Sequence, residues 1–440
     1  MKKEKEETNI KNSSLITHCS SLLIKDGRII DPSSNLDEIT DILIENGKIT
    51  RIGKIQESKQ KDLEMINAKG MIVVPGLIDM HVHLREPGYE YKETIKTGTS
   101  AARAGGFTAL CCMPNTNPVN DSRSVTEFIL DRTVKEGSTY VFPIGAISKG
   151  LKGEELSEMA DLVEAGCVAF SDDGKSVTDS ELMRRAMEYA RALGAPIISH
   201  CEDTNLSRGG VMNEGFVSTE LGLQGIPDSA EEVIVSRDLL LAEITGVKLH
   251  IAHVSTKGSV RLIKEAKERG IGVTAETCPH YFLLTDNEVR GYDSDAKVNP
   301  PLRTEEDIEA IRQGLKDGTI DVIATDHAPH NISEKLVEFD YAPFGIVGLE
   351  TALSLSLKLV EWGVLTINEL IEKMTANPAR ILGLKKGLLS IGSDADITII
   401  DMNQEVTVDP MKFKSKGRNT PFKGAKLKGL PIITILRGKT

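Results

Sequence analysis

The sequence lacks the features of several large classes of protein. None of its six cysteines forms a Cys-x-x-Cys pair, and most lie in apolar or strand-like surroundings, which argues against a disulfide framework. We expect neither a signal peptide nor a transmembrane helix, because the apolar stretches near the N-terminus are short and interrupted. Positive charge is in deficit, since 53 Lys and Arg residues face 65 Asp and Glu residues and leave a net charge of -12. This balance opposes non-specific binding to nucleic acids or anionic membranes. We therefore expect a cytoplasmic protein with reduced thiols that acts on a small molecule.

The length of 440 residues suits a barrel with a small appended domain, because single barrels routinely reach about 250 residues. Residues 1–20 are expected to be a disordered extension. In residues 21–70, short alternating apolar runs are separated by turn signals such as Asp26-Gly27 and Asn46-Gly47, which predicts antiparallel strands. Residues 386–440 show the same pattern of short apolar runs separated by turns. The two ends are therefore predicted to close one β-sandwich beside a barrel at residues 71–385.

The middle of the chain alternates apolar strand runs with amphipathic helical segments. The predicted strands are Leu77 to His81, Thr108 to Met113, Tyr140 to Ile147, Val168 to Ser171, Pro196 to His200, Lys248 to His253, Gly272 to Thr277 and Ile320 to Thr325. The helical patterns between and after them include Thr94 to Ala104, Ser124 to Lys135, Glu154 to Ala165, Asp179 to Leu193, Ser229 to Thr245, Thr256 to Arg269, Glu305 to Asp317 and Leu349 to Trp362. Eight such units in succession predict an α/β fold, a parallel (β/α)8 barrel of the TIM type.

A His-x-His pair follows the first predicted barrel strand. Side chains two apart in a strand point to the same face, so His81 and His83 can aim their imidazole nitrogens at one point. Two such nitrogens are half of a metal site, although paired histidines near a strand end also occur as surface or hydrogen-bonded core residues. The remaining ligands must come from elsewhere in the chain.

Further metal-ligating residue types occur where other predicted strands end. Because the active site of a parallel barrel lies at the strand ends, these side chains should meet in one ring of loops. They are Asp172 and Asp173 after the fourth strand, His200 on the fifth, His253 on the sixth and Asp326 after the eighth. Four histidines and two or three carboxylates can hold two divalent metals that share a carboxylate, an arrangement that generates a nucleophile at neutral pH and polarises a carbonyl.

The segments that carry these residues resemble the signature motifs of dihydroorotases, of the bacterial type I branch of the amidohydrolase superfamily. The similar segments are Asp79 to Gly88, Phe170 to Gly174, His200 to Asp203, Glu276 to Phe282, Lys297 to Arg303, Ala324 to His330 with Lys335, and Asn419 to Phe422. The resemblance covers nearly everything after about residue 21.

The resemblance implies a ligand set for two zinc ions per subunit. His81, His83 and Asp326 would hold one zinc, His200 and His253 the other, and Asp173 would bridge them. In many relatives the bridge is a carboxylated lysine on the fourth strand, but no lysine lies between Val168 and Asp173. An aspartate bridge fits better, while Asp172 and a modified Lys175 stay open as alternatives.

The resemblance also implies roles around the substrate. Asp326 would be the catalytic proton shuttle, passing a proton to the leaving ring nitrogen during hydrolysis and removing one from the ureido nitrogen during ring closure. Arg85 could form a charge-assisted bond to the substrate carboxylate. The residues implied in substrate binding are His83, Arg85, Asn115, Asn299, His330, Phe344 and Gly345.

These expectations combine into one function. The chain is expected to be a zinc-dependent dihydroorotase that converts N-carbamoyl-L-aspartate to L-dihydroorotate and water in de novo pyrimidine synthesis. One alternative is another cyclic amidase, namely a hydantoinase, dihydropyrimidinase or allantoinase. Another is an inactive scaffold for aspartate carbamoyltransferase. The resemblance gives a homodimer and a complex with that transcarbamoylase as candidate assemblies.

Two further histidines are expected outside the metal site. His250 lies three residues before His253, so in an extended strand the two should point to opposite faces and His250 should face the helices. His280 lies just past the seventh strand, and we expect it to pack beside the site rather than in it.

Overall fold

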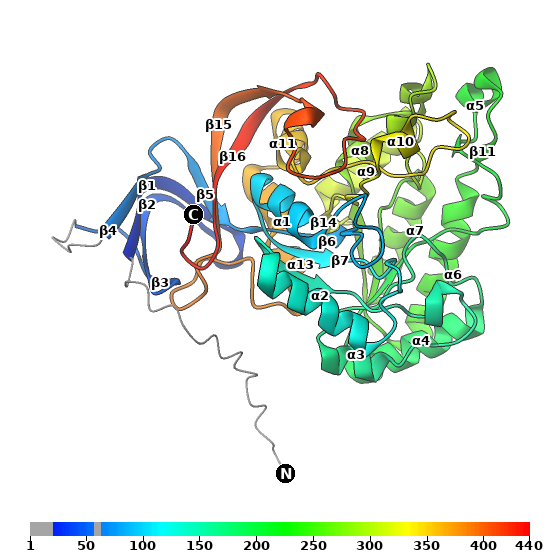
Figure 1. Ribbon diagram of the computed structural model, residues 1–440, viewed down its shortest axis with the longest axis horizontal. Helices are drawn as coiled ribbons and strands as arrows, with labels where there is room; N and C mark the ends of the chain where they lie inside the picture. Colours follow the sequence, from blue (N-terminus) through cyan, green and yellow to red (C-terminus); the bar gives the residue numbers. More distant parts are fainter. Residues whose placement is uncertain (1–20, 57–62) are drawn as a thin grey trace, which may run out of the picture.

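The computed structural model describes residues 21–56 and 63–440, so the expected extension at residues 1–20 lies outside the described residues. A small β-sheet lies beside a larger α/β unit (Figure 1). None of the described helices has the length and apolar character needed to cross a membrane.

The larger unit contains two parallel sheets whose strands alternate with helices. The first sheet is formed by β6 (Leu77–Val82), β7 (Phe107–Cys112) and β8 (Tyr140–Pro143). The second is formed by β9 (Ile197–Ser199), β12 (Leu249–Ile251), β13 (Val273–Thr277) and β14 (Val322–Ile323). These are seven of the eight predicted strands. The two sheets are linked by isolated parallel bridges, Gly145 to Phe170 to Ile197 on one side and Val82 to His327 on the other.

The fourth predicted strand, Val168 to Ser171, is shorter than expected. Only Phe170 is paired as a strand residue, with Gly145 and Ile197. Its neighbours still bond in strand fashion, because Gly145 N donates to Ala169 O and Ser171 N donates to Gly145 O at 3.0 and 2.9 Å. The segment then turns at Asp172, whose carbonyl accepts from Lys175 N, and this turn ends the pairing.

Helices cover the strands, and several of them begin at capping residues that the sequence supplies. Thr94 forms a capping box with Thr97 before α1, and Asp179 accepts hydrogen bonds from Glu181 N and Leu182 N before α4. The third predicted helix starts at Met159 rather than at Glu154. The helices are α1 (Ile95–Ala104), α2 (Arg123–Glu136), α3 (Met159–Ala165), α4 (Ser180–Leu193), α5 (Phe216–Leu221), α6 (Ser229–Thr245), α7 (Lys257–Glu268), α8 (Pro279–Leu283), α9 (Glu305–Asp317), α10 (Ile332–Lys335), α11 (Ala352–Glu361), α12 (Ile367–Met374) and α13 (Ala376–Leu382).

A two-stranded sheet, β10 (Met212–Asn213) and β11 (Gly225–Ile226), interrupts the connection between β9 and α6. Five short 3-10 helices complete the described elements, at Pro32–Ser34, Lys149–Leu151, Asp286–Val289, Ser294–Ala296 and Pro410–Lys412.

Both ends of the described chain contribute to one seven-stranded mixed sheet. Its order is β16-β15-β5-β1-β2-β3, with β4 also paired to β1. The strands are β1 (Ser21–Asp31), β2 (Leu36–Glu45), β3 (Lys48–Ile52), β4 (Leu63–Asn67), β5 (Ile72–Pro75), β15 (Ile397–Thr407) and β16 (Lys426–Ile435). The predicted β-sandwich is not confirmed, because these strands are hydrogen-bonded into a single sheet. The sheet also includes β5, so it continues past the boundary expected at residue 70.

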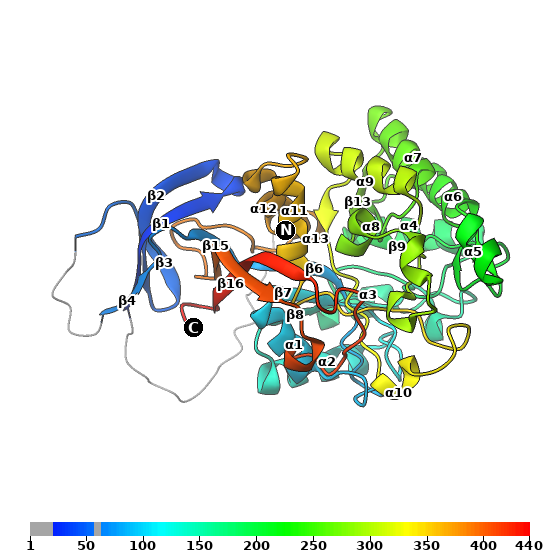
Figure 2. The same ribbon diagram turned by 90° about the horizontal axis from the view of Figure 1, so that it is seen from above.

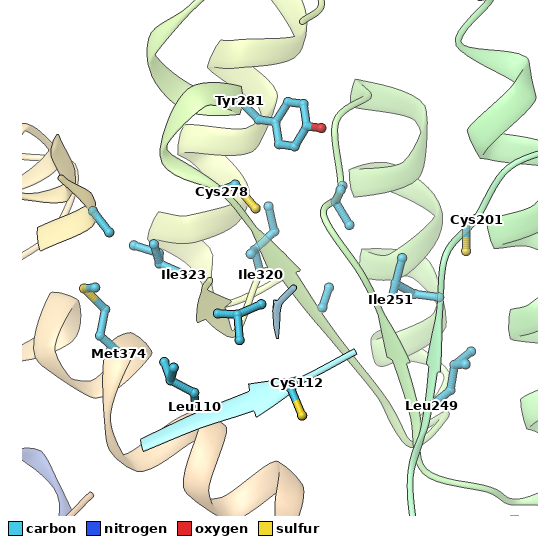
Figure 3. Packing of buried hydrophobic residues seen from close by; sticks show 14 of the residues in the cluster. Leu110, Cys112, Cys201, Leu249, Ile251, Cys278, Tyr281, Ile320, Ile323 and Met374 are labelled. Carbon is cyan, nitrogen blue, oxygen red and sulfur yellow. The ribbon is translucent and has the colours of Figure 1, made fainter. Parts of the chain in front are cut away.

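Two apolar layers fix the strands of the larger unit. One cluster collects side chains from the inner face of successive strands, including Met80, Ile144, Ile198, Ala252 and Val322. A second, larger cluster fills the space between strands and helices; Figure 3 shows Leu110, Leu249, Ile251 and Ile323 in it. Strands that are apolar on both faces are held rigidly, which fixes the position of the residues at their ends. The view in Figure 2 shows the small sheet to one side of this unit, next to α11, α12 and α13.

Candidate metal and substrate site

The polar residues at the strand ends converge on one place. His81 lies within β6, His83 just after it, Asp173 after the bridge at Phe170, His200 after β9, His253 after β12 and Asp326 after β14. Two of these residues and Arg85 have positive φ angles, 33° at His253, 48° at Asp326 and 61° at Arg85. L-residues rarely adopt this conformation, and it ends the alternation of faces along each strand. The backbone thus redirects these side chains at the point where the strands stop.

The first candidate metal group consists of His81, His83 and Asp173. His81 Nε2 lies 3.2 Å from Asp173 Oδ1, and His83 Nε2 lies 3.3 Å from Asp173 Oδ2. Asp326 Oδ1 joins this group at 2.9 Å from His83 Nε2 and 3.6 Å from His81 Nε2. All four side chains are buried, so the cluster offers two imidazoles and two carboxylates to one point.

The second group consists of Asp173, His200 and His253. Asp173 Oδ1 lies 3.6 Å from His200 Nδ1 and 3.5 Å from His253 Nε2. Asp173 therefore stands between the two groups. Its neighbour Asp172 points away and accepts hydrogen bonds from Ile147 N and Ser148 N at 2.7 and 3.0 Å. Lys175 is exposed. The geometry thus favours Asp173 over both alternatives as the shared carboxylate.

The outer nitrogens of three histidines are held by acceptors. His81 Nδ1 lies 2.5 Å from Glu276 Oε1, His83 Nδ1 lies 2.8 Å from Asn115 Oδ1, and His200 Nε2 lies 2.9 Å from Glu202 Oε2. A neutral imidazole that donates from one nitrogen presents a lone pair on the other. Each ring is thereby oriented with a metal-ligating nitrogen toward Asp173.

The pKa values and the unpaired polar atoms of the cluster indicate whether it could hold metal ions. Burial disfavours charge on Asp173, but the charge of His81 and the close approach of the surrounding histidine rings outweigh burial and hold its pKa well below the usual range. Burial opposes protonation of His200, yet the carboxylates of Asp173 and Glu202 raise its pKa to about 10. The buried carboxylates therefore need a positive charge close by to be stable in their ionised form. Among the described residues, His81 Nε2 and Asp173 Oδ1 are buried atoms without a hydrogen-bond partner. Divalent cations would meet both needs, so the residues fit a metal centre.

The cluster opens onto a cavity of about 200 Å³. Every residue predicted to bind substrate lines it, and so do five of the six predicted ligands, His83 being in both sets. The lining residues include His83, Arg85, Asn115, Asp173, His200, His253, Asn299, Asp326, His330, Phe344 and Gly345. His81 lies beneath this lining and is fully buried.

Arg85 and His330 line the same cavity as the metal cluster's histidines. Arg85 Nε donates to Pro329 O at 3.2 Å, and burial lowers the pKa of its guanidinium, although the carboxylates of Asp326 and Asp173 partly offset this effect. Lys92 Nζ donates to His330 Nδ1 at 3.3 Å, so His330 Nε2 carries the proton and donates to Phe344 O at 2.8 Å. Burial, Arg85 and Lys92 lower the pKa of His330 to about 2, which keeps this ring neutral.

Comparisons with known proteins agree with this site. A family model described as "Dihydro-orotase-like" matches residues 70–259, and one described as "Amidohydrolase family" matches residues 245–440. The chain is 60% identical to a dihydroorotase of Geobacter metallireducens over 95% of its own length and 99% of the relative's. It is 61% identical to a dihydroorotase of Pelotomaculum thermopropionicum, over 95% and 97%. This chain belongs to the dihydroorotase family.

Solved structures with a similar fold include two hydantoinases. The L-hydantoinase of Arthrobacter aurescens has a TM-score of 0.86 and 26% identity, and covers 96% of each chain. The D-hydantoinase of a Thermus species has a TM-score of 0.79 and 27% identity, and covers 95% and 94%. The family membership predicted from the sequence motifs is confirmed, and this chain has a fold similar to that of these hydantoinases.

The structure of this dihydroorotase family member corrects the expectation for His250. His250 is buried on the inner face, where its Nε2 lies 3.2 Å from Glu276 Oε2 on β13. The expectation that it faces the helices is wrong because the positive φ of His253 breaks the alternation on which that argument depended. His280 is buried against Tyr281, with ring centroids 4.1 Å apart, and burial lowers its pKa to about 3.

Glu276 and Glu202 were not predicted as site residues. Glu202 Oε2 also accepts a hydrogen bond from Asn299 Nδ2 at 3.0 Å. Glu202 therefore links Asn299, which was predicted to contact the substrate, to His200, which was predicted to bind a metal. In the sequence, Glu202 stands out only because it lies two residues after His200, and Glu276 only because it lies near the end of a predicted strand. Neither position distinguishes these glutamates from a surface carboxylate.

Proposed function

We propose that this chain is a zinc-dependent dihydroorotase that interconverts N-carbamoyl-L-aspartate and L-dihydroorotate plus water in de novo pyrimidine (UMP) biosynthesis. The observation that carries the proposal is the position of Arg85, a half-buried guanidinium on the wall of the cavity into which Asp173, Asp326 and the metal-site histidines open. A substrate carboxylate there would neutralise the guanidinium while the ring amide lies over the metal cluster.

The residues named above would hold two zinc ions. His81, His83 and Asp326 would bind one, His200 and His253 the other, and Asp173 would be shared. Bound zinc would supply a nucleophile at neutral pH and would polarise the amide carbonyl. The two groups of residues that share Asp173 support the proposal of two ions.

The protein's own groups would move the proton and position the substrate. In hydrolysis, water adds to the ring amide carbonyl, the C–N bond breaks, and Asp326 transfers the proton of the water to the leaving nitrogen. In ring closure, Asp326 removes the proton from the ureido nitrogen, the C–N bond forms and water leaves. Asp326 lines the cavity, which allows this transfer.

Polar groups around the cavity would fix the substrate ring. Arg85 would bind the carboxylate, with the His330 ring and the Asn115 amide beside it, while Asn299 and the backbone of Phe344 and Gly345 would contact the ring. The Asn115 and Asn299 side chains are already fixed by His83 and Glu202, so their free amide atoms are oriented before substrate arrives.

A second candidate function is hydrolysis of uncharged rings, which the likeness to hydantoinase structures favours. Arg85 argues against it, because an uncharged ring would leave this half-buried guanidinium in the cavity without a substrate carboxylate to bind. A scaffold for aspartate carbamoyltransferase without activity would not need six buried ligand residues.

The deciding experiment is an assay of purified, zinc-replete protein with dihydroorotate, N-carbamoyl-aspartate, hydantoin, dihydrouracil and allantoin, repeated after chelation. We expect chelator-sensitive interconversion of the first pair alone. Turnover of an uncharged ring would assign the protein to the hydantoinases, and metal binding without any turnover would favour the scaffold.

Three further proposals concern the architecture of the protein. We infer that the strands close into an eight-stranded barrel, which is supported by the parallel bridges at Phe170 and between Val82 and His327. We infer that the small sheet curls over its own core as two layers, which is supported by the separate apolar cluster of β1, β2, β3, β5 and β15. The domain division proposed is residues 21–75 with 386–440 for the sheet and the intervening residues for the barrel.

The cytoplasmic location, the homodimer and the complex with aspartate carbamoyltransferase stay predictions.

A further inference from the structure

We propose that Glu276 and His250 are positioning residues for the zinc site of His81 and His83. In this proposal they form a buried relay that fixes the ring orientation and the tautomer of His81. The inference rests on the proposed metal site and adds two residues that neither touch the substrate cavity nor coordinate a metal.

The relay joins two neighbouring strands of one sheet, β12 and β13, to β6 of the other sheet. Glu276 on β13 is fully buried and places Oε1 2.5 Å from His81 Nδ1 on β6. Its other oxygen, Oε2, lies 3.2 Å from His250 Nε2 on β12. His250 Nδ1 lies 2.8 Å from Thr274 Oγ1, again on β13. Both carboxylate oxygens are thus occupied, and the side chain has a single orientation.

The hydrogen-bond roles follow from the chemistry of each group. An ionised carboxylate only accepts, so His81 donates from Nδ1 and His250 donates from Nε2. His81 Nε2 is then left with a lone pair, and it is the atom that lies 3.2 Å from Asp173 Oδ1. The carboxylate also raises the basicity of the imidazole it accepts from, which strengthens the bond to a metal.

The second metal group offers a contrast within the same site. His253 Nδ1 is buried and has no hydrogen-bond partner among the described residues. His200 is held by Glu202, which is partly exposed, whereas Glu276 is fully buried. Loss of the Glu276 relay should therefore weaken the His81 and His83 site and leave the other site unchanged.

The test uses three variants of the full-length protein. Glu276→Leu removes the relay, Glu276→Gln keeps an oxygen that can accept from His81, and Asp31→Asn is the matched control. Asp31 is also a fully buried carboxylate, but it lies in the small sheet and accepts hydrogen bonds from Ser33 and Leu389 N. Zinc affinity and stoichiometry are measured by competition with a chromophoric chelator, and kcat and KM at limiting and at saturating zinc.

We expect Glu276→Leu to weaken one of two zinc sites by about 10- to 100-fold, the range seen when such partners of ligands are lost. Glu276→Gln should cause a several-fold loss at the same site, because His250 can change its tautomer to accept from the new amide. Excess zinc should restore kcat in both variants with KM unchanged, and Asp31→Asn should bind zinc as the parent does.

Several results would overturn the inference. Equal zinc affinity of the parent and Glu276→Gln at both sites would do so, and this variant decides the matter if Glu276→Leu does not fold. Equal weakening of both sites, or loss of activity that zinc does not restore, would mean a general structural role. A parent protein that binds no zinc would instead refute the proposed function, so the two failures are distinguishable.

Discussion

At the scale of single residues, adjacent carboxylates have opposite roles. Burial raises the pKa of Asp172 to about 6 despite hydrogen bonds from Ser148 and Ile147, and these bonds tie the chain after Phe170 to the preceding loop. Asp173 faces the histidines and its pKa is lowered. One residue of offset therefore separates a structural carboxylate from the candidate metal bridge, because successive side chains near a strand end point in different directions.

The role proposed for Asp326 gives a first residue-scale prediction. Asp326→Asn should lower kcat by about 10²- to 10⁴-fold, the contribution of a positioned general acid–base group, while the protein stays folded. Asp321→Asn is the matched control, because Asp321 precedes the other end of the same strand and binds Ala275 N and Lys267. Steady-state kinetics with far-ultraviolet circular dichroism would measure both. Substantial residual turnover in Asp326→Asn would remove it from the shuttle role.

Arg85 gives a second residue-scale prediction. Arg85→Met should raise KM for dihydroorotate by about 10- to 100-fold, since a hydrogen bond to a charged group contributes about 1.5–3 kcal/mol. Arg123→Met, which removes an arginine from a surface pair with Asp161, should leave KM unchanged. An unaltered KM in Arg85→Met would contradict carboxylate binding at this position.

At the scale of elements, strand ends position the site and a lysine secures the small sheet. Lys386, between α13 and β15, donates to Asp394 Oδ2 at 2.8 Å and to Asp396 Oδ2 at 2.7 Å. Lys48 on β3 reaches Asp394 Oδ1 at 2.7 Å. Burial opposes ionisation of Asp394, but these lysines outweigh it and lower its pKa to about 2. The chain leaving the larger α/β unit is thus tied to the small sheet by charge.

This network predicts a pH-dependent loss of stability. The pKa of Asp394 is lower in the folded protein than in the unfolded chain, so its stabilisation is present above about pH 4 and is lost as the pH falls toward 2. Asp394→Asn should lower the free energy of unfolding by about 1–2 kcal/mol at pH 6, discounted for partial exposure, and by less at pH 3. Urea unfolding at both pH values measures this.

The control for that series is Glu38→Gln, which alters an exposed carboxylate on β2 of the same sheet. It should leave the unfolding midpoint unchanged at both pH values. A constant difference between Asp394→Asn and the parent across the pH range would show that the ion pairs do not provide the stabilisation.

At the scale of the whole molecule, the small sheet and the substrate cavity are connected. The segment between β15 and β16 extends to the cavity, where Asn419 Oδ1 accepts from His330 N at 3.1 Å. Asn419 Nδ2 donates to Gly345 O at 2.9 Å and to Ala328 O at 3.0 Å. Lys335 Nζ also donates to Gly345 O, at 3.2 Å. The C-terminal part of the chain therefore supports the loop that closes the cavity beside Phe344.

The sequence by itself determined the order of strands and helices, the family and the residues that line the cavity. Apolar runs, capping residues and the His-x-His pair are local features, and local spacing is enough to place them. The candidate ligands could be predicted because each lies at the end of a predicted strand of a parallel barrel.

The tertiary structure alone decided what depends on neighbouring strands. Glu276 contacts His250 because β12 and β13 pair side by side, and it contacts His81 because the fold brings β6 of the other sheet close to β13. Glu276 and His250 are 195 and 169 positions from His81 along the chain, a separation that no local pattern reports. The inward direction of His253 depends on a positive φ that packing imposes, which the alternation rule does not anticipate. The single sheet from both chain ends likewise required the pairing of β5 with β15.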